Sequence, residues 1–555
     1  MIAMLDDGEL ARCWTDLFRT DGCTKGIEDL CDKSSKKSVM EIPYSEIVTY
    51  NKEFSDYLLL KPEHTIMMGE ALLRELIGLS KDPHISIFGL PDTCIEDFDD
   101  TNRHADGRFI SIKGTVIKAS IPIRDRNRPQ VKHVVDYQCM EIITGFDVSS
   151  QSVNVRLRNH VVKNDIFGRT LKFNGFWKND STSGQNNDFC IHFEVNSIEL
   201  LENDFGISFT DGDIEEITKA SKDPLFFDNL IKSIAPTIAG MDDIKEVLAL
   251  QLFGGVEHIS DDNCYNPGAI NVLLLAEPYA GVPTLVKAMS RLSPRGYLLS
   301  REDWRCVTPL IGRVVDDHFG KDMTSIDVGA VTIANKGLVC CEGIDRLERT
   351  EMLTNDVAYH GYDHITGKIS CNLPADTSVL ATTLPIWGRV EKGVDPLGQM
   401  GIPNWALSKL GLVMVVRDVP EEIRDRYIAE QIINKHLRAN ILGMKDEDVK
   451  KVILDRTSDS STVYSEDFIK KYVAYAKLNC NPKVQESNLK IIEEGFLSFR
   501  ERHTIVSTLW LRLLINLAEA SARSRLSDIV DDSDASKAVR IMGDALTNLE
   551  SIKNT

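Results

Sequence analysis

Residues 230–256 read LIKSIAPTIAGMDDIKEVLALQLFGGV, and residues 269–287 read AINVLLLAEPYAGVPTLVK. The first stretch has the apolar spacing of a helix. The second has a short buried strand over 270–275, a Gly/Pro loop and another helix. Phosphate would bind between that strand and that helix, because free backbone N–H groups at a helix N-terminus attract anions. This order of elements predicts a nucleotide-binding α/β fold.

The loop departs from the phosphate-binding pattern G-x-x-x-x-G-K-[ST], which would fall on residues 276–283. Gly281 matches the pattern, but Val282 stands at the lysine position and Pro283 at the hydroxyl position that would hold magnesium. Tyr279 adds bulk where the backbone should approach phosphate closely. The candidate nucleotide-binding residues are therefore a degenerate set: Ala276, Glu277, Pro278, Tyr279, Ala280, Gly281, Val282 and Pro283.

The composition limits the class of protein. A chain of 555 residues can hold three or four domains. Its net charge of −20 argues against a generally basic nucleic-acid coat, although a local basic channel is compatible with it. The 12 cysteines are scattered without a C-x-x-C pair, which is typical of reduced thiols. We see no secretory signal and no membrane span, and expect a cytoplasmic or nucleoid-associated protein, or a nuclear one in a eukaryote.

The region before the nucleotide fold divides into two predicted domains. Residues 1–100 have helical apolar spacing, and residues 101–202 alternate in short segments that predict a small β-barrel. The hairpin tip at 177–189 offers Lys178 as a DNA-binding candidate, but with few other cations it is more typical of a solvated turn. Residues 203–223 are acidic and polar, and we interpret them as a linker.

Residues 224–420 form the predicted core and residues 421–555 a helical lid. The buried run 338–341 ends in Glu342, where a P-loop ATPase has an Asp-Glu pair that positions magnesium and polarises water. Asp345 follows as a further nucleotide-site candidate, and Thr383 ends the next apolar strand. Strands alternating with helices indicate a doubly wound α/β layer, so the predicted fold class is multidomain α/β plus β.

Several segments closely resemble the minichromosome maintenance (MCM) family of replicative helicases. They are SIAPTIAGMDDIKEVLALQLFGGV (233–256), INVLLLAEP (270–278), LSPRG (292–296), GAVTIANKGLVCCEGIDRL (329–347), TSVLATTLP (377–385), LGLVMVVRDVPEEIRDRYIA (410–429) and LAEASARSRLSDIV (517–530). Upstream, FISIKGTVIKAS (109–120) is similar to the family's oligonucleotide-binding barrel. The resemblance implies an N-terminal helical domain, that barrel, an AAA+ P-loop-type core and a helical lid, in hexameric rings around DNA.

Carried over residue by residue, the resemblance implies lost chemistry. The family's Ile-Asp-Glu becomes Cys341-Glu342-Gly343, and its sensor asparagine becomes Leu384. Its arginine finger becomes Lys409, and its second-sensor arginine falls on Leu509. The catalytic candidates that remain are Glu342 and Lys409. The hairpin lysine that moves DNA falls on Thr366, with Lys368 two residues away as a second DNA-binding candidate, and the zinc knuckle is reduced to Cys139.

Three hypotheses remain open. The first is an MCM-like protein of DNA replication with an inactive ATPase, acting as a structural or regulatory subunit, as a homo-oligomer or beside an active paralogue. The second is an active ATP-dependent DNA helicase that uses Lys287, Glu342 and Lys409. The third is another AAA+ motor, such as a transcription activator or chelatase. We expect no metal site and no zinc, weak ATP and magnesium binding at most, and weak DNA binding.

Overall fold

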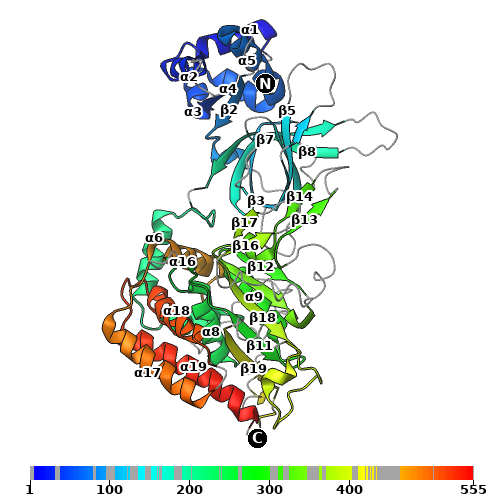
Figure 1. Cartoon of the computed structure of the whole chain (residues 1–555). Helices are drawn as coiled ribbons and strands as arrows, with labels where there is room; N and C mark the ends of the chain where they lie inside the picture. The colour runs from blue at the N-terminus through cyan, green and yellow to red at the C-terminus, as the bar shows by residue number, and fades with distance from the viewer. Residues whose placement is uncertain are drawn as a thin grey trace. The chain divides into compact units, whose positions relative to one another are not determined.

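The computed structural model describes all residues except the following: 1–4, 32–37, 79–82, 96–106, 122, 126–134, 144–151, 159–160, 162–165, 181–189, 202, 237, 239, 260–264, 301–309, 317–323, 347–361, 366–370, 403–410, 419, 423–424, 427, 431–432, 434–462, 504–505 and 554–555. Its contacts divide the chain into two compact units. The N-terminal unit comprises 1–206, 313–328 and 366–369, and the C-terminal unit comprises 207–312, 329–365 and 370–555. Figure 1 labels the elements of both.

The first part of the N-terminal unit packs helices around a buried indole. The helices are α1 (Asp7–Leu17), α2 (Asp21–Cys31), α3 (Tyr44–Tyr50), α4 (Lys52–Leu60) and α5 (Pro62–Ile77), with the 3₁₀ turn η1 (Asp92–Cys94). Trp14 is fully buried, and its Nε1 donates to the Thr65 carbonyl at 2.9 Å. Strands β1 (Val39–Pro43) and β2 (His84–Phe88) pair in parallel. The helices were predicted; this strand pair was not.

A β-barrel follows in the same unit. Its strands are β3 (Ile110–Ser120), β4 (Ile123–Asp125), β5 (Val135–Ile143), β6 (Ser152–Arg158), β7 (Thr170–Asp180) and β8 (Cys190–Leu200). Pairings run β3–β7–β8–β6–β5 and return from β5 to β3, which closes a five-stranded ring. The hairpin of β13 (Arg313–Asp316) and β14 (Thr324–Asp327) extends the sheet through β14–β3, an addition that the sequence did not predict.

The segment interpreted as a linker contains a helix, α6 (Asp211–Ser221). Thr210 and Asp213 form a capping box at its start, in which the Thr210 side chain accepts from the Asp213 N–H at 3.2 Å. Residues from 207 onward belong to the C-terminal unit. The interpretation of 203–223 as a plain connection is therefore wrong for its second half.

The C-terminal unit is built on a five-stranded parallel sheet of order β12-β15-β18-β11-β19. The strands are β12 (Gly296–Leu299), β15 (Leu338–Glu342), β18 (Ser378–Thr383), β11 (Val272–Ala276) and β19 (Leu412–Val416). Alternate residues of β11 enter two different apolar clusters, Leu274 on one face and Leu273 on the other. A strand buried on both faces explains the unbroken apolar run in the sequence.

Helices cover this sheet and form the lid. Those before and within the core are α7 (Phe226–Ser233), α8 (Asp242–Phe253), α9 (Val282–Leu292) and α10 (Ala330–Ile333), with 3₁₀ turns η5 (Ile344–Arg346) and η6 (Pro396–Gln399). The lid helices are α16 (Glu466–Asn479), α17 (Glu486–Arg502), α18 (Leu509–Ser524) and α19 (Asp532–Lys553), and Figure 1 shows the last three side by side. Small antiparallel pairs are β9 (His258–Ile259) with β10 (Tyr265–Asn266), and β16 (Tyr362–Ile365) with β17 (Cys371–Pro374).

Candidate nucleotide site

The segment predicted as a degenerate phosphate loop lies between a strand and a helix. β11 lies between β18 and β19, and the loop from Glu277 to Gly281 connects its carboxyl end to α9. Glu342 ends β15, and Thr383 ends β18 beside Leu275 of β11. Ligands of parallel α/β sheets bind at this carboxyl edge. The loop, Glu342 and Thr383 therefore share one edge of the sheet.

The helix that should cradle phosphate begins without the groups that nucleotide chemistry needs. Gly281 adopts a left-handed φ of 83° as the N-cap of α9. Val282 follows with 2% exposure and packs into the apolar core, so a hydrocarbon occupies the position of the ammonium group. Pro283 lacks an N–H, which removes one of the donors that a phosphate would use. This helix start offers neither a side-chain cation nor its full set of backbone donors.

Tyr279 adds strain and bulk to the loop. It has a φ of 69° in the left-handed region and is fully exposed. A bulky residue in that region costs of order 1–3 kcal/mol, and a fully exposed ring recovers none of it by burial. The side chains of this loop are thus not those of a phosphate loop.

The Glu277 carboxylate accepts hydrogen bonds from two neighbouring loops. One carboxylate oxygen accepts the Val390 N–H at 2.9 Å, and the other accepts the Asp418 N–H at 2.8 Å. The Glu277 N–H donates to the Val416 carbonyl at 3.0 Å. These bonds join the chain after β11 to the segments that follow β18 and β19. The loop is therefore fixed by hydrogen bonds to two other segments of the protein.

Of the residues at the ends of β15 and β18, Thr383 is likewise committed to internal contacts. Glu342 is half-buried, and the N–H of Gly343 donates to the carbonyl of Thr382 at 3.1 Å. The buried Thr383 hydroxyl donates to the Met400 carbonyl at 3.2 Å and lies 3.5 Å from Asp345 Oδ1. Asp345 belongs to η5, the 3₁₀ turn that follows β15. A threonine hydroxyl turned inward in this way does not face a γ-phosphate.

The structure describes some of the other predicted site residues and not others. Lys368, Lys409 and Thr366 lie outside the described residues. Leu509 begins α18 and is half-buried. Lys178 lies on β7 of the N-terminal unit, where its ammonium pairs with Glu63 and, at 3.7 Å, with Glu194.

Sequence reasoning missed two buried charged residues of the lid, Arg523 and Glu519, which hydrogen-bond to the backbone of the core. Arg523 on α18 donates through Nη1 to the carbonyls of Phe253, Gly254 and Gly255 at 2.9, 3.0 and 2.7 Å. Burial lowers the pKa of Arg523 and raises that of Glu519. The Glu519 carboxylate accepts the Val256 N–H at 2.8 Å. A sequence signal for these residues was present, because 517–524 includes charged and polar residues within an otherwise apolar helix. In the structure this helix has hardly any exposed position.

Two kinds of feature are not found in the described part of the chain. It contains no cluster of three or more His, Cys, Asp and Glu side chains that could hold a metal ion. Cys139 lies half-buried on β5, where burial raises the pKa of its thiol. The helices described by the structure include none long and apolar enough to cross a membrane.

Comparisons with known proteins agree with this architecture. The family described as the MCM P-loop domain matches residues 213–436, and the MCM AAA-lid domain matches residues 467–546. The DNA replication licensing factor MCM2 of Arabidopsis thaliana is 27% identical over 419 residues, which are 71% of this chain and 45% of that protein. An MCM-type protein of Methanocaldococcus jannaschii is 28% identical over 368 residues, covering 65% of this chain and 52% of that one.

The licensing factor MCM3 of Entamoeba histolytica is 27% identical over 434 residues, covering 71% of this chain and 70% of that protein. Against the first two of these relatives, the chain spans about half of their length. The two matched domains account for the parallel sheet with its phosphate loop and for the helices that follow it. The chain belongs to the MCM family and has its AAA+ α/β core and helical lid.

Proposed function

We propose that this protein serves DNA replication as an MCM subunit that does not hydrolyse ATP and acts through its structure. The observation that carries this proposal is Val282, buried in the core at the position of the phosphate-binding lysine. Valine is apolar, so no rotamer of Val282 can supply a cation to a phosphate at this position. Hydrogen bonds to Glu277 also tie this loop to the segments that contain Val390 and Asp418.

The expected loss of rate is large. Removing one charge-stabilising group costs about 10²–10³ in rate, and an arginine finger contributes about 10³–10⁵. These losses are not additive, but the lysine, the base, the sensor and the finger are all replaced. Lys287, a substitute cation in the helicase hypothesis, is exposed on α9 five residues beyond Val282. Five residues rotate a helix by about 500°, which turns Lys287 to a face well away from that of Val282.

The partner we propose is another MCM subunit, either a second copy of this chain or an active paralogue. The relatives named as MCM2, MCM3, MCM4 and MCM6 licensing factors support a place in a DNA-associated assembly. We further propose that the closed barrel is an oligonucleotide-binding fold with weak DNA affinity. In support, Lys178 is neutralised by carboxylates, so this cation is not available to phosphates.

The test is steady-state ATP turnover by the purified chain, alone and mixed with an active MCM-family protein. We expect no turnover by the chain alone, and any turnover in the mixture should be unchanged when Glu342→Ala replaces the wild type. DNA-stimulated turnover by the chain alone that Glu342→Ala abolishes would instead establish the helicase hypothesis.

A further inference from the structure

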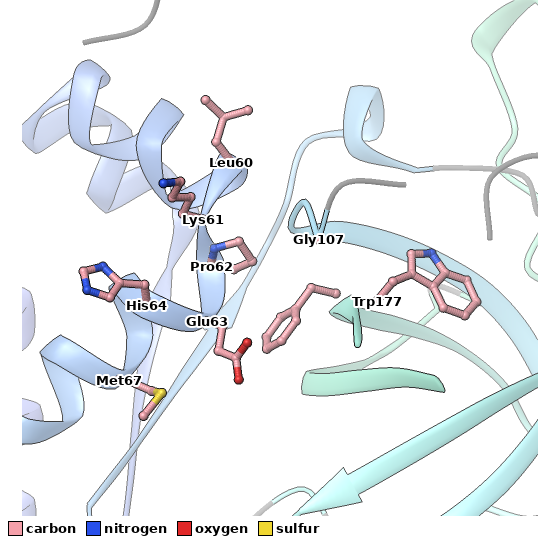
Figure 2. Close-up of a pocket in the computed structure, with 9 residues that line it drawn as sticks. Leu60, Lys61, Pro62, Glu63, His64, Met67, Gly107 and Trp177 are labelled. Atoms are coloured by element: carbon pink, nitrogen blue, oxygen red, sulfur yellow. The ribbon is translucent and has the colours of Figure 1, made fainter. Parts of the chain in front are cut away.

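The N-terminal unit contains a pocket between the start of α5 and strand β7, which Figure 2 shows. Its volume is about 410 Å³. Lys61 and Glu63 both line it, and the ammonium group of Lys178 pairs with Glu63 and with Glu194. These charges compensate each other, so the pocket favours no charged ligand of either sign and we assign it none.

Residues 386–400 form an internally hydrogen-bonded segment between β18 and β19, which we call the connector. Its centre is Gln399, which is fully buried. The Gln399 Oε1 accepts the Glu391 N–H at 2.8 Å, and its Nε2 donates to the carbonyls of Glu391 and Val394 at 3.0 Å each. The Gln399 carbonyl accepts the Ile386 N–H at 2.9 Å. These bonds link distant parts of the connector, so we expect it to move as one piece.

The connector is attached at one point to the last helix of the lid. Leu546 of α19 belongs to the apolar cluster on one face of the central sheet, and Ile552 belongs to the cluster on the other face. Ile552 is fully buried, and its carbonyl accepts the Gly393 N–H at 2.9 Å. Val390 of the connector belongs to the same cluster as Ile552. Both packing and a hydrogen bond therefore fix the connector to the end of α19.

The connector is attached at a second point to the predicted phosphate loop. The Val390 N–H donates to one carboxylate oxygen of Glu277, at the start of that loop, at 2.9 Å. The other oxygen of the same carboxylate accepts the Asp418 N–H, from the segment after β19, at 2.8 Å. The position of the Glu277 side chain thus depends on the connector, and the Asp418 N–H is sensitive to that position.

We propose that the connector couples the end of α19 to the loop 277–281. A displacement of Ile552 moves Gly393, the connector carries the movement to Val390, and the Glu277 carboxylate carries it to the loop. Packed side chains and hydrogen-bond networks are the elements that can couple two distant places in a protein. Anything that displaces the last helix of the lid therefore reshapes the carboxyl edge of the sheet. This coupling goes beyond the proposed function, because it holds whether or not the chain hydrolyses ATP.

Hydrogen–deuterium exchange of the full chain tests the coupling. The reporter is the peptide that contains Asp418, because its N–H donates to Glu277 and lies outside the connector. Ile552→Ala removes most of a fully buried side chain and should speed exchange at Asp418 at least about fivefold. Thr547→Ala is its control, because Thr547 is exposed near the same end of α19, and exchange should stay within about twofold of the wild type.

A second variant tests the connector itself. Gln399→Leu removes three side-chain hydrogen bonds and should also speed exchange at Asp418 at least about fivefold, whereas Lys392→Leu, at an exposed position of the connector, should leave it unchanged. In a Glu277→Gln background, Ile552→Ala should change exchange at Asp418 by less than about twofold. The glutamine oxygen cannot hold both the Val390 and the Asp418 N–H, so the coupling is already broken there.

Three results would overturn the proposal. One is exchange at Asp418 that stays within about twofold of the wild type in both Ile552→Ala and Gln399→Leu. A second is an effect of Ile552→Ala that is as large in the Glu277→Gln background as in the wild type, because the movement would then bypass Glu277. A third is an equal acceleration of the β15 peptides in both variants, because a general loss of stability would then account for the effect. ATP turnover, measured separately, tests the proposed function alone.

Discussion

The Glu277 carboxylate accepts two backbone hydrogen bonds, from Val390 and from Asp418, and we call this pair the Glu277 brace. The effect of removing it can be worked out from the structure. In the variant Glu277→Gln, one carboxylate oxygen is replaced by an NH₂ group, which cannot accept a hydrogen bond. At least one of the two backbone N–H groups, that of Val390 or that of Asp418, then loses its acceptor. A hydrogen bond to a charged group is worth about 1.5–3 kcal/mol, so the affected amide should exchange with deuterium roughly ten to a hundred times faster.

Hydrogen–deuterium exchange by mass spectrometry measures this effect on the peptides that contain Val390 and Asp418. The matched control is Glu391→Gln, because the side chain of Glu391 is exposed in the same loop as Val390. Exchange at both peptides that stays within about twofold of the wild type would refute the brace. Exchange in the wild type that slows strongly when ATP and magnesium are added would also refute it, because the loop would then depend on nucleotide.

Three further predictions concern stability. Arg523→Met leaves four backbone carbonyls without their donor and should lower the melting temperature by roughly 10 °C, whereas the exposed Arg291→Met should change it little; scanning fluorimetry measures both. Burial lowers the pKa of Lys477 to about 8, below its unfolded value, so the unfolded chain binds more protons between about pH 8 and 10 and this group's contribution to stability rises with pH. The melting temperature of Lys477→Met relative to wild type should therefore be highest near pH 7 and fall toward pH 10, and a constant difference would contradict that titration. A Cβ at Gly296 would lie 1.9 Å from a backbone carbonyl oxygen, so Gly296→Ala should destabilise by more than about 2 kcal/mol in urea unfolding, while Gly398→Ala, which meets nothing within 4 Å, should stay within about 0.5 kcal/mol.

The central sheet was predictable because its strands are buried on both faces. A run such as 272–276 is apolar throughout, and only a strand between two layers of helices needs that pattern. The capping box at Thr210 was also readable, because a threonine followed three residues later by aspartate marks a helix start. It was overlooked because the surrounding segment is acidic and polar.

Other features depend on contacts between distant segments. The pairing of β1 with β2 joins residues about 45 positions apart, and β14 reaches β3 across about 200 positions. Short strands of this kind have no distinctive local pattern, so the sequence could not place them. The role of Glu277 likewise depends on where the loops after β18 and β19 run. The loss of the lysine at Val282 was visible in the sequence, but its burial was not.

The most direct measurement is calorimetric titration of the purified chain with ATP and magnesium, alone and with an active MCM-family partner. A Val282→Lys/Pro283→Ser double variant serves as the comparison, because it restores the cation and the hydroxyl. We predict that the wild-type chain alone gives no heat of nucleotide binding, and that any binding in the mixture comes from the partner's own site. Micromolar ATP binding by the wild-type chain alone, accompanied by hydrolysis that Glu342→Ala abolishes, would contradict the account.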